Sequence, residues 1–292
     1  MRKVLLINRK IELEPNLLKL KQKLEDTGEL EVSTASFADL NLLIDGENSS
    51  IRNRRTGEDL ADFEKILCIT TAPFDRRYVF SSYGCYCRKK GVKMADDEFG
   101  NTNSKLYEMW RLWEKDVPVP KTAYGTPKFL GECLTGPFEN RAILKSVRGT
   151  KGRNNHFVQS PVEIYKIIEE NPESEYILQE YIPSEGDYRI ITLGYEPYYA
   201  AFFVNRKIYW RNNSDSHGSK RTIKIDELDP EIIAIAKAAS QAVRRRFAGV
   251  DIITNKENGK SYVLEVNHTP QVLTGSFLEE KSDSLLRYFL SD

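Results

Sequence analysis

Short apolar segments alternate with helical patterns over the first hundred residues. Apolar runs at 4–7, 30–32 and 66–69 are typical of strands, and between the first two leucine recurs at helical spacing. A second helical pattern extends from about residue 75 to residue 90, and a short strand at 91–94 follows it. This alternation predicts a parallel α/β layer that ends near residue 100.

A second unit begins after that point. Asn103 is a suitable N-cap for a helix whose apolar positions are Leu106, Met109, Trp110 and Trp113, and the Val-Pro-Val-Pro sequence that follows cannot continue a helix. Strands are predicted at 142–145, 176–181, 188–193 and 198–204, with a helix at 161–170. The polar stretch 211–220 predicts a long loop, which is either functional or disordered.

The clearest helix signal starts at Asp229-Pro230. An N-cap and a proline at the first helical position precede apolar residues at helical spacing as far as Phe247, and Gly249 is the predicted stop. The arginines 244–246 would then complement the negative end of the helix dipole as solvated side chains, which we prefer to a nucleic-acid contact.

Two apolar strands, 250–253 and 262–267, form a predicted hairpin through Asn258-Gly259. A two-residue turn would place Asp251 opposite Val266. A three-residue loop, 257–259 with Gly259 in the left-handed conformation, places Asp251 opposite Glu265, and this is the arrangement that we predict.

In that register three oxygen-bearing side chains converge, those of Asp251, Glu265 and Asn267. Carboxylate and amide oxygens suit a hard cation such as Mg²⁺ or Mn²⁺ that also binds phosphate. The alternative is the polar outer face of an edge hairpin, which would leave a carboxylate within an apolar strand unexplained.

Composition narrows the class of protein. The 292 residues are enough for about two domains, and 43 Lys and Arg against 43 Asp and Glu give a net charge of zero, which argues against a general nucleic-acid coat. No apolar run approaches the roughly 20 residues of a membrane span, and the amino terminus lacks a secretory h-region. We therefore expect a cytoplasmic protein that binds neither nucleic acid nor membrane, with its four cysteines reduced.

A lysine and a glycine-containing loop suggest a phosphate site. Lys145 ends a strand and is followed by Gly149, Thr150, Lys151 and Gly152, where backbone amides can approach phosphate oxygens. An ordinary basic turn explains the loop about as well. Further along the chain come 179–182, Gln-Glu-Tyr-Ile, and then Asp187-Tyr188-Arg189.

Taken in this order, the stretch from about 103 to 275 resembles the ATP-grasp superfamily, and most closely its RimK-like carboxylate–amine ligases. The resemblance is strongest in 249–270 and in 179–189. It implies an ATP-grasp fold in which two α+β subdomains, 101–182 and 183–292, sandwich ATP, preceded by a Rossmann-like pre-ATP-grasp α/β domain at 1–100. Two departures affect the substrate: His268-Thr269-Pro270-Gln271 replaces Ser-Pro-Gly, and Arg153-Asn154-Asn155 follows the glycine loop.

The resemblance also implies roles for individual residues. Lys105 and Lys145 would bind the α- and β-phosphates, and Gly149, Thr150, Lys151 and Gly152 would form the lid. The stretch Gln179, Glu180, Tyr181 and Ile182 would form the adenine hinge, with Asp187 near the ribose. The groups around the γ-phosphate and the acyl-phosphate would be Arg189, Arg206, Arg211 and Asn213. The magnesium ligands would be Asp251, Glu265 and Asn267.

The activity implied is ATP- and Mg²⁺-dependent (or Mn²⁺-dependent) joining of a carboxylate to an amine through an acyl-phosphate, with release of ADP and phosphate. The substrates would be amino acids or peptides. A homo-oligomer, most simply a dimer, is the default for a soluble enzyme. Two alternatives remain at this point: a small-molecule kinase on the same scaffold, served by basic residues such as Arg148 and Arg153, and a non-catalytic ATP-binding protein.

Overall fold

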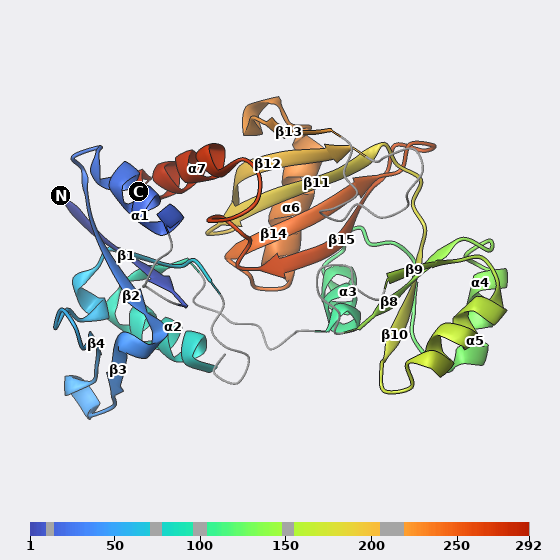
Figure 1. Cartoon of the computed structure of the whole chain (residues 1–292), viewed down its shortest axis with the longest axis horizontal. Coiled ribbons are helices and arrows are strands. Elements are labelled where there is room, and N and C mark those ends of the chain that lie inside the picture. The colour runs from blue at the N-terminus through green and yellow to red at the C-terminus, as the bar shows by residue number, and fades with distance from the viewer. Residues whose placement is uncertain (10–14, 71–77, 96–103, 148–154, 205–218, 292) are drawn as a thin grey trace.

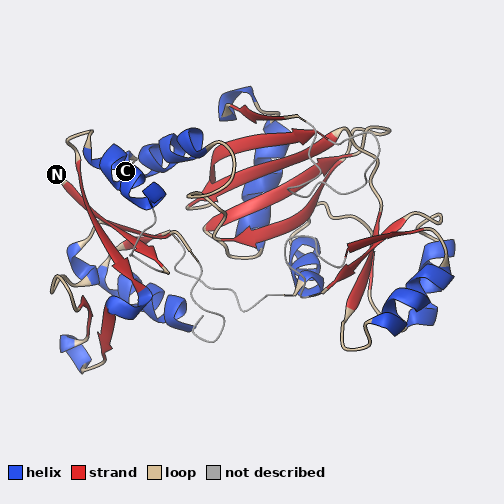
Figure 2. Ribbon diagram, in the orientation of Figure 1, coloured by secondary structure: helices blue, strands red, loops and turns tan. Residues whose placement is uncertain are grey.

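The computed structural model describes residues 1–9, 15–70, 78–95, 104–147, 155–204 and 219–291. In this part of the chain, three larger sheets carry helices on their faces, as Figure 2 shows. The N-terminal sheet lies at one end of the molecule, the five-stranded sheet in the middle and the remaining sheet at the other end (Figure 1).

The N-terminal sheet is parallel throughout, which confirms the predicted α/β layer. Its strand order is β2-β1-β5-β6. The strands are β1 (Arg2–Asn8), β2 (Leu30–Ser36), β5 (Lys65–Cys68) and β6 (Lys93–Met94), and the helices are α1 (Pro15–Glu25) and α2 (Tyr78–Lys90). Alternate residues of β1 enter two different cores, so both faces of the sheet are covered.

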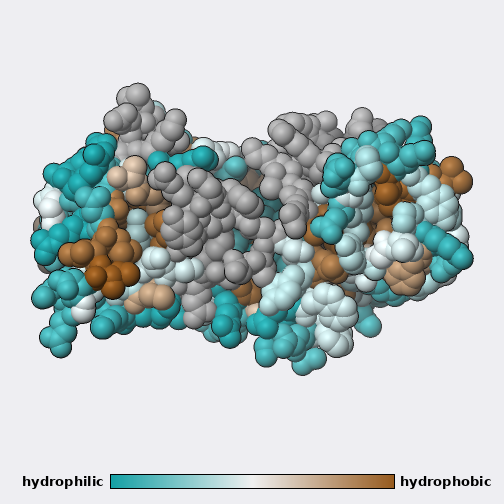
Figure 3. All heavy atoms as spheres, turned by 90° about the horizontal axis from the view of Figure 1, so that it is seen from below, coloured by the Kyte–Doolittle hydropathy of each residue, from teal (hydrophilic) through white to brown (hydrophobic). Residues whose placement is uncertain are grey.

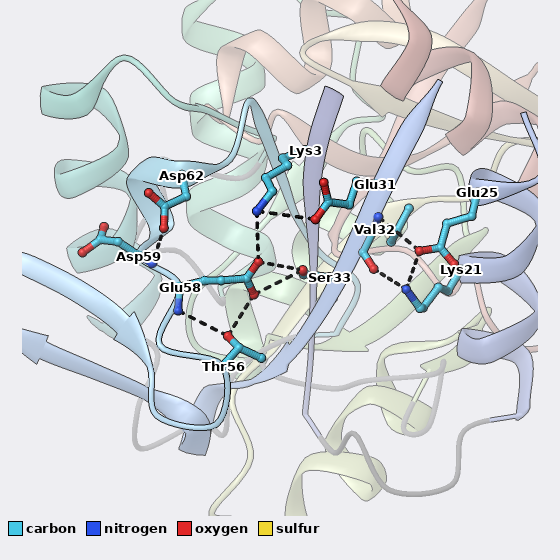
Figure 4. Close-up of polar contacts among 10 residues, drawn as sticks. All are labelled: Lys3, Lys21, Glu25, Glu31, Val32, Ser33, Thr56, Glu58, Asp59 and Asp62. Atoms are coloured by element: carbon cyan, nitrogen blue, oxygen red, sulfur yellow. Dashed lines mark hydrogen bonds and ion pairs between the residues drawn. The ribbon is translucent and has the colours of Figure 1, made fainter. Parts of the chain in front are cut away.

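A small antiparallel hairpin, which the sequence pattern did not predict, extends this domain. It consists of β3 (Leu40–Leu43) and β4 (Ser50–Asn53), flanked by the short 3₁₀ turns η1 (Phe37–Asp39), η2 (Gly46–Asn48) and η3 (Leu60–Asp62). Glu58, just after the hairpin, accepts hydrogen bonds from Thr56 Oγ1 at 2.8 Å and from Ser33 Oγ of β2 at 3.2 Å, and Lys3 of β1 lies 3.5 Å away (Figure 4). These polar contacts fasten the hairpin to the parallel sheet.

The C-terminal helix α7 (Leu278–Leu290) packs back on this first domain. Phe289 shares one core with Val4 of β1, Leu20 of α1 and Phe247 of the five-stranded sheet. The buried Lys65 donates from Nζ to the carbonyl of Tyr288 at 2.9 Å, and Arg2 donates to the carbonyl of Leu290 at 2.8 Å. The two cations satisfy carbonyls at the helix C-terminus, so the first and last elements of the chain are held together.

The second sheet has the order β7-β10-β8-β9 and is antiparallel. Its strands are β7 (Thr122–Ala123), β8 (Ala142–Ser146), β9 (Asn155–Val158) and β10 (Tyr176–Glu180), and helices α4 (Pro127–Thr135) and α5 (Pro161–Glu170) pack on it. The predicted helix at 161–170 and the predicted strands at 142–145 and 176–181 are thereby confirmed, apart from the last residue of the second strand.

Helix α3 (Lys105–Glu114) lies between this sheet and the central one (Figure 1). Its N-cap is Ser104, whose Oγ accepts from the Tyr107 N–H at 3.4 Å, one residue later than the Asn103 that we predicted. Met109 is buried as expected, whereas Trp110 and Trp113 are exposed and stack edge to face. The buried face of this short helix runs through Glu108, Met109 and Leu112.

The central sheet has the order β13-β12-β11-β14-β15 and is antiparallel throughout. Its strands are β11 (Gly186–Leu193), β12 (Glu196–Val204), β13 (Lys220–Ile223), β14 (Phe247–Thr254) and β15 (Ser261–His268). Helix α6 (Pro230–Ala242), preceded by the 3₁₀ turn η5 (Ile225–Glu227), packs on one face. At one end the other face packs against α7, and elsewhere it carries the charged residues described below. Together these sheets confirm the expected combination of a parallel α/β layer with helix-covered antiparallel sheets after it.

Helix α6 ends earlier than predicted. Its C-cap is Val243, Arg244 adopts a left-handed conformation with φ of 55°, and Phe247 and Gly249 belong to β14. The left-handed residue ends the helix and turns Arg245 inward, where only 3% of it is exposed. The prediction of solvated arginines was therefore wrong for Arg245.

None of the helices in the described residues is long and apolar enough to cross a membrane. Seen from below, the described surface is largely hydrophilic, with apolar residues gathered in separate patches, one of them over the N-terminal domain (Figure 3).

Candidate active site

A row of charged side chains crosses three strands of the central sheet. Arg189 of β11 lies opposite Asp251 of β14, which lies opposite Glu265 of β15. Residues that are directly opposite in an antiparallel sheet project from the same face, so the three side chains share the face that α6 leaves uncovered. The predicted pairing of Asp251 with Glu265 is confirmed.

The reason that we gave for this pairing was wrong. The hairpin loop holds four residues, 256–259, closed by the Asn255 N–H donating to the Lys260 carbonyl at 2.8 Å. Near the loop, Ile252 pairs with Val263, and a bulge between Asp251 and Ile252 then shifts the register by one residue. Gly259 is left-handed, with φ of 72°, as predicted. The bulge, and not the loop length, brings the two carboxylates face to face.

The row is closely connected. Arg189 donates to Asp251 through two parallel hydrogen bonds, Nε to Oδ1 at 2.7 Å and Nη2 to Oδ2 at 2.6 Å. Asn267 Nδ2 lies 3.2 Å from Asp251 Oδ2, so the third predicted ligand is also in contact. Lys105, at the start of α3, donates from Nζ to Glu265 Oε1 at 2.7 Å. Each carboxylate thus has a protein cation beside it.

Lys145 belongs to β8 of the other antiparallel sheet and lies close enough to the row for Glu265 and Asp251 to act on its charge. Its Nζ donates to the Oε1 atom of Gln179, and Gln179 Nε2 donates in turn to Thr122 Oγ1 at 3.2 Å. Gln179 is almost completely buried, so its amide oxygen fixes the position of the Lys145 ammonium group. The structure therefore assigns the Gln179 side chain to Lys145, a role that the sequence did not suggest.

The electrostatics of the site follow from burial and from these neighbours. Burial lowers the pKa of Lys145 to about 8, and repulsion by Lys105 adds to this effect while Glu265 opposes it. Burial would raise the pKa of Glu265, but the ammonium groups of Lys105 and Lys145 outweigh it and hold that pKa below its usual value. Burial raises the pKa of Asp251 despite the neighbouring Arg189, and Asp251 raises the pKa of Arg189.

The strand end 179–182 meets two neighbouring segments through its backbone. The Glu180 N–H donates to the Lys121 carbonyl at 2.9 Å, and the Tyr181 N–H donates to the Arg141 carbonyl at 3.2 Å. The Tyr181 ring packs against Phe157 edge to face, and Ile182 is buried. The N–H groups of Glu180 and Tyr181 are therefore already engaged within the protein.

Asp187 lies at the start of β11, two residues before Arg189 and hence on the same face. Its side chain is buried, and its charge contributes to the raised pKa of Arg189. The remaining predicted residues lie outside the described part of the chain: Gly149, Thr150, Lys151, Gly152, Arg206, Arg211 and Asn213.

Two further lysines close to the row were missed by sequence reasoning. Lys281 of α7 donates to the Thr274 carbonyl at 3.1 Å, and Lys220 of β13 donates to Ser276 Oγ in the same loop. Burial, together with the positive charges of Arg189 and Lys220, lowers the pKa of Lys281 to about 8. Neither lysine forms an ion pair with a described carboxylate. No sequence signal marked Lys281, since it sits at an ordinary position in an amphipathic helix.

The donor set at the row fits a hard divalent cation. Within the described residues no group of three His, Cys, Asp or Glu side chains is arranged to hold a metal ion. Asp251, Glu265 and Asn267 supply two carboxylates and an amide instead, a set that needs further oxygen ligands from a bound phosphate. Glu265 is about one-third exposed, so the row is open to such a ligand.

Comparisons with known proteins identify the family and the fold. A family model described as ATP-grasp domain matches residues 102–274, more than half of the chain, whereas a search of curated proteins found no match. The solved structure of the ATP-grasp ligase PsnB complexed with minimal precursor, Mg and ADP has a TM-score of 0.74 at 15% identity and covers 98% of this chain and 96% of that one.

Two other solved structures share the fold over nearly the whole chain. The macrocyclase MdnC from Microcystis aeruginosa MRC, bound with precursor peptide MdnA, has a TM-score of 0.67 at 12% identity, with 99% of this chain and 100% of that chain covered. A RimK domain ATP-grasp protein from Sphaerobacter thermophilus DSM 20745 has a TM-score of 0.59 at 14% identity, again with 99% and 100% covered. At such identities the likeness shows the fold alone.

Proposed function

This chain belongs to the ATP-grasp family, and from that premise we propose that it is an ATP-dependent carboxylate–amine ligase. A carboxylate oxygen of the first substrate attacks the γ-phosphorus of ATP, and the bond to ADP breaks. The amine of the second substrate then attacks the acyl carbon, an amide bond forms, phosphate leaves and the amine loses a proton. An unactivated carboxylate is a poor electrophile, and the acyl-phosphate removes that difficulty.

One observation carries the proposal: the row Arg189–Asp251–Glu265 on one sheet face, with Lys105 of α3 bound to Glu265 and the half-buried Lys145 nearby. Phosphoryl transfer needs chiefly positioning and electrostatic stabilisation, and this arrangement offers cations and metal-directed oxygens within one surface. We assign Lys105 and Lys145 to the α- and β-phosphates. Glu265 holds Lys105 until nucleotide arrives, and Gln179 keeps Lys145 directed at the same place.

Mg²⁺ would be held by Asp251, Glu265 and Asn267, and when bound it would neutralise charge on the phosphate oxygens. Arg189, fixed by its two hydrogen bonds to Asp251, would meet the transferred phosphoryl group. We keep Arg206, Arg211 and Asn213 as candidates for the same group, and Gly149, Thr150, Lys151 and Gly152 as the lid. Glu180 and Ile182 would meet the adenine edge and Asp187 the ribose.

The substrates that we propose are a peptide or amino-acid carboxylate and an amine. The similar folds include an ATP-grasp ligase solved with a minimal precursor and a macrocyclase solved with a precursor peptide, which favours a peptide. Lys281 lies close enough to Arg189 and Lys220 for both to lower its pKa, and these cations suit the substrate carboxylate. We also propose domain boundaries at 1–100, 101–182 and 183–292, with α7 of the last unit completing the core of the first.

The test is a product assay. The protein is incubated with ATP, Mg²⁺ and pooled amino acids and acidic peptides, ADP and phosphate are followed, and products are analysed by mass spectrometry. Glu265→Ala is expected to abolish turnover, while Glu257→Ala, an exposed carboxylate on the loop of the same hairpin, controls for a change of charge alone.

A product heavier by one condensation, formed with ADP and lost in Glu265→Ala, supports the ligase. A phosphorylated hydroxyl product formed with ADP would replace it with a kinase, and AMP would exclude the acyl-phosphate route. Acceptor-independent binding of ATP without turnover of any pooled compound would favour a non-catalytic ATP-binding protein.

A further inference from the structure

Strand β15 carries two of the proposed metal ligands, Glu265 and Asn267, and lies at the edge of its sheet. The residue between them is Val266. In an antiparallel ladder, alternate residues of an edge strand direct both backbone groups away from the neighbouring strand, where they need other partners. Val266, opposite Val250, is such a residue.

Two charged side chains supply those partners. The Val266 N–H donates to Glu108 Oε1 at 2.7 Å, and the Val266 carbonyl accepts from Arg245 Nη1. Glu108 and Arg245 are themselves ion-paired at 2.5 Å, with 5% and 3% of their surfaces exposed. The pair thus satisfies the backbone groups that one residue of a sixth strand would otherwise pair with. It holds the backbone of Val266 between the two proposed metal ligands, Glu265 and Asn267.

The bulge explains why the register of β15 needs a separate contact at this point. Because the register changes between Asp251 and Ile252, the hairpin loop does not by itself determine which residue of β15 faces Asp251. A slip of one residue would turn the Glu265 and Asn267 side chains to the opposite face. The contact to Val266 lies beyond the bulge, on the ligand side, and fixes the register there.

Helix α3 connects the backbone contact at Val266 to the charged row. Lys105 and Glu108 are three residues apart and therefore on the same side of the helix. Lys105 holds the Glu265 carboxylate, and Glu108 holds the backbone of the next residue. Arg245 comes from the turn after α6, so α3 and the end of α6, which share one core, meet at Val266.

We propose that the Glu108–Arg245 ion pair is a positioning device that sets the register of β15 and thereby brings Glu265 and Asn267 to the metal and nucleotide. Both are positioning residues, because they act through the backbone and not on substrate. Stability alone does not account for them, since a buried ion pair is often replaced by apolar residues without loss of stability. The inference rests on the proposed function through the metal role of Glu265.

The experiment compares Mn²⁺ affinity in the presence of ADP, measured by electron paramagnetic resonance, with thermal unfolding of the same samples. The variants are the apolar replacement Glu108→Leu/Arg245→Met and the conservative Glu108→Gln, which keeps an acceptor for the Val266 N–H. Asp39→Asn is the matched control, because Asp39 is also a buried carboxylate held by arginines but lies in the N-terminal domain.

We expect the double variant to remain folded and to bind Mn²⁺ about tenfold or more weakly, as is usual when a group supporting a metal ligand is lost. Glu108→Gln should retain most of the affinity, and Asp39→Asn should lower the unfolding temperature without changing Mn²⁺ binding. A folded double variant with wild-type affinity would overturn the proposal.

If the double variant does not fold, Arg245→Lys decides, because it keeps the charge and loses the reach of the guanidinium. Weaker Mn²⁺ binding in a folded Arg245→Lys protein supports the proposal, and unchanged binding overturns it. Glu265→Ala, measured in parallel, separates the two levels: if it binds Mn²⁺ like the wild type, the metal role in the proposed function fails, whatever the other variants do.

Discussion

Nucleotide affinity should depend on pH through Lys145. Burial places the pKa of this lysine at about 8 in the free protein, and phosphate oxygens beside it would restore the value toward its usual 10.5 or higher. Below pH 8 the lysine is already protonated, so binding is at full strength. Above pH 8 binding must take up a proton, so affinity falls as pH rises through the pKa of the free protein.

The magnitude follows from that pKa. With a value of about 8 in the free protein and above 10 in the complex, ADP affinity should be about tenfold weaker at pH 9 than at pH 7, which is about 1.4 kcal/mol. At pH 8 binding should take up about half a proton at this site. The substitution Lys145→Arg should remove the dependence, because arginine stays protonated throughout this range.

Isothermal titration calorimetry measures both quantities. Titrations of ADP in two buffers with different ionisation enthalpies give the proton uptake directly, and a series from pH 7 to 9 gives the affinity. Lys281 also has a pKa of about 8, so Lys281→Arg serves as the comparison that should leave the ADP titration unchanged. An affinity independent of pH in the wild type, or a dependence that survives Lys145→Arg, would refute the assignment of Lys145 to the phosphates.

Three further predictions each concern one residue of the chain. Hydrogen bonds from Ser36 and two arginines overcome the effect of burial and hold the pKa of Asp39 at about 2. The pKa of Asp39 is lower in the folded protein than in the unfolded chain, so the ionised carboxylate stabilises the fold fully above pH 4, and this contribution is lost as pH falls toward 2. Asp39→Asn should therefore lower the free energy of unfolding, measured with urea, by about 2 kcal/mol at pH 7 and by little at pH 2. An equal cost at both pH values would contradict this. The substitution Gly186→Ala would drive a methyl group into the backbone carbonyl of the neighbouring strand and should lower the free energy of unfolding by about 1–3 kcal/mol. Gly125→Ala is the control, because its methyl group meets only an exposed ring. Similar denaturation midpoints for the two variants would count against this prediction. Finally, Lys281→Gln should raise the KM of the carboxylate substrate about tenfold with the KM of ATP unchanged, since it removes a charge-assisted hydrogen bond; the reverse pattern would place Lys281 at the nucleotide.

Local sequence determined much of the element list. The proline after Asp229, the alternation in the first hundred residues and the apolar run at 176–180 each predicted an element that the structure contains. Such signals are short-range, because capping, backbone geometry and hydrophobic periodicity depend on residues within about two turns of one another. Order along the chain was also enough to indicate the family, which the match over 102–274 supports.

The end of α6 shows where a local signal failed, and the exposed tryptophans show what apolar type alone leaves undecided. The periodicity of α6 continues into Phe247, yet the helix stops at Ala242 because Arg244 takes the left-handed conformation and Arg245 is drawn to Glu108. Trp110 and Trp113 fit an apolar face by type, but the neighbouring elements cover a different side of α3.

The sequence by itself determined which residues carry oxygen and positive charge near the site, and it placed Asp251, Glu265 and Lys145 among them. Only the tertiary structure decided how they meet. A bulge places Asp251 opposite Glu265, and Gln179 accepts a hydrogen bond from Lys145. Lys281, almost a hundred residues from Arg189 along the chain, lies close enough to Arg189 to have its pKa lowered. The physical reason is that register, burial and charge pairing depend on contacts between distant segments, and their energies exist only once the sheet and the helices have packed.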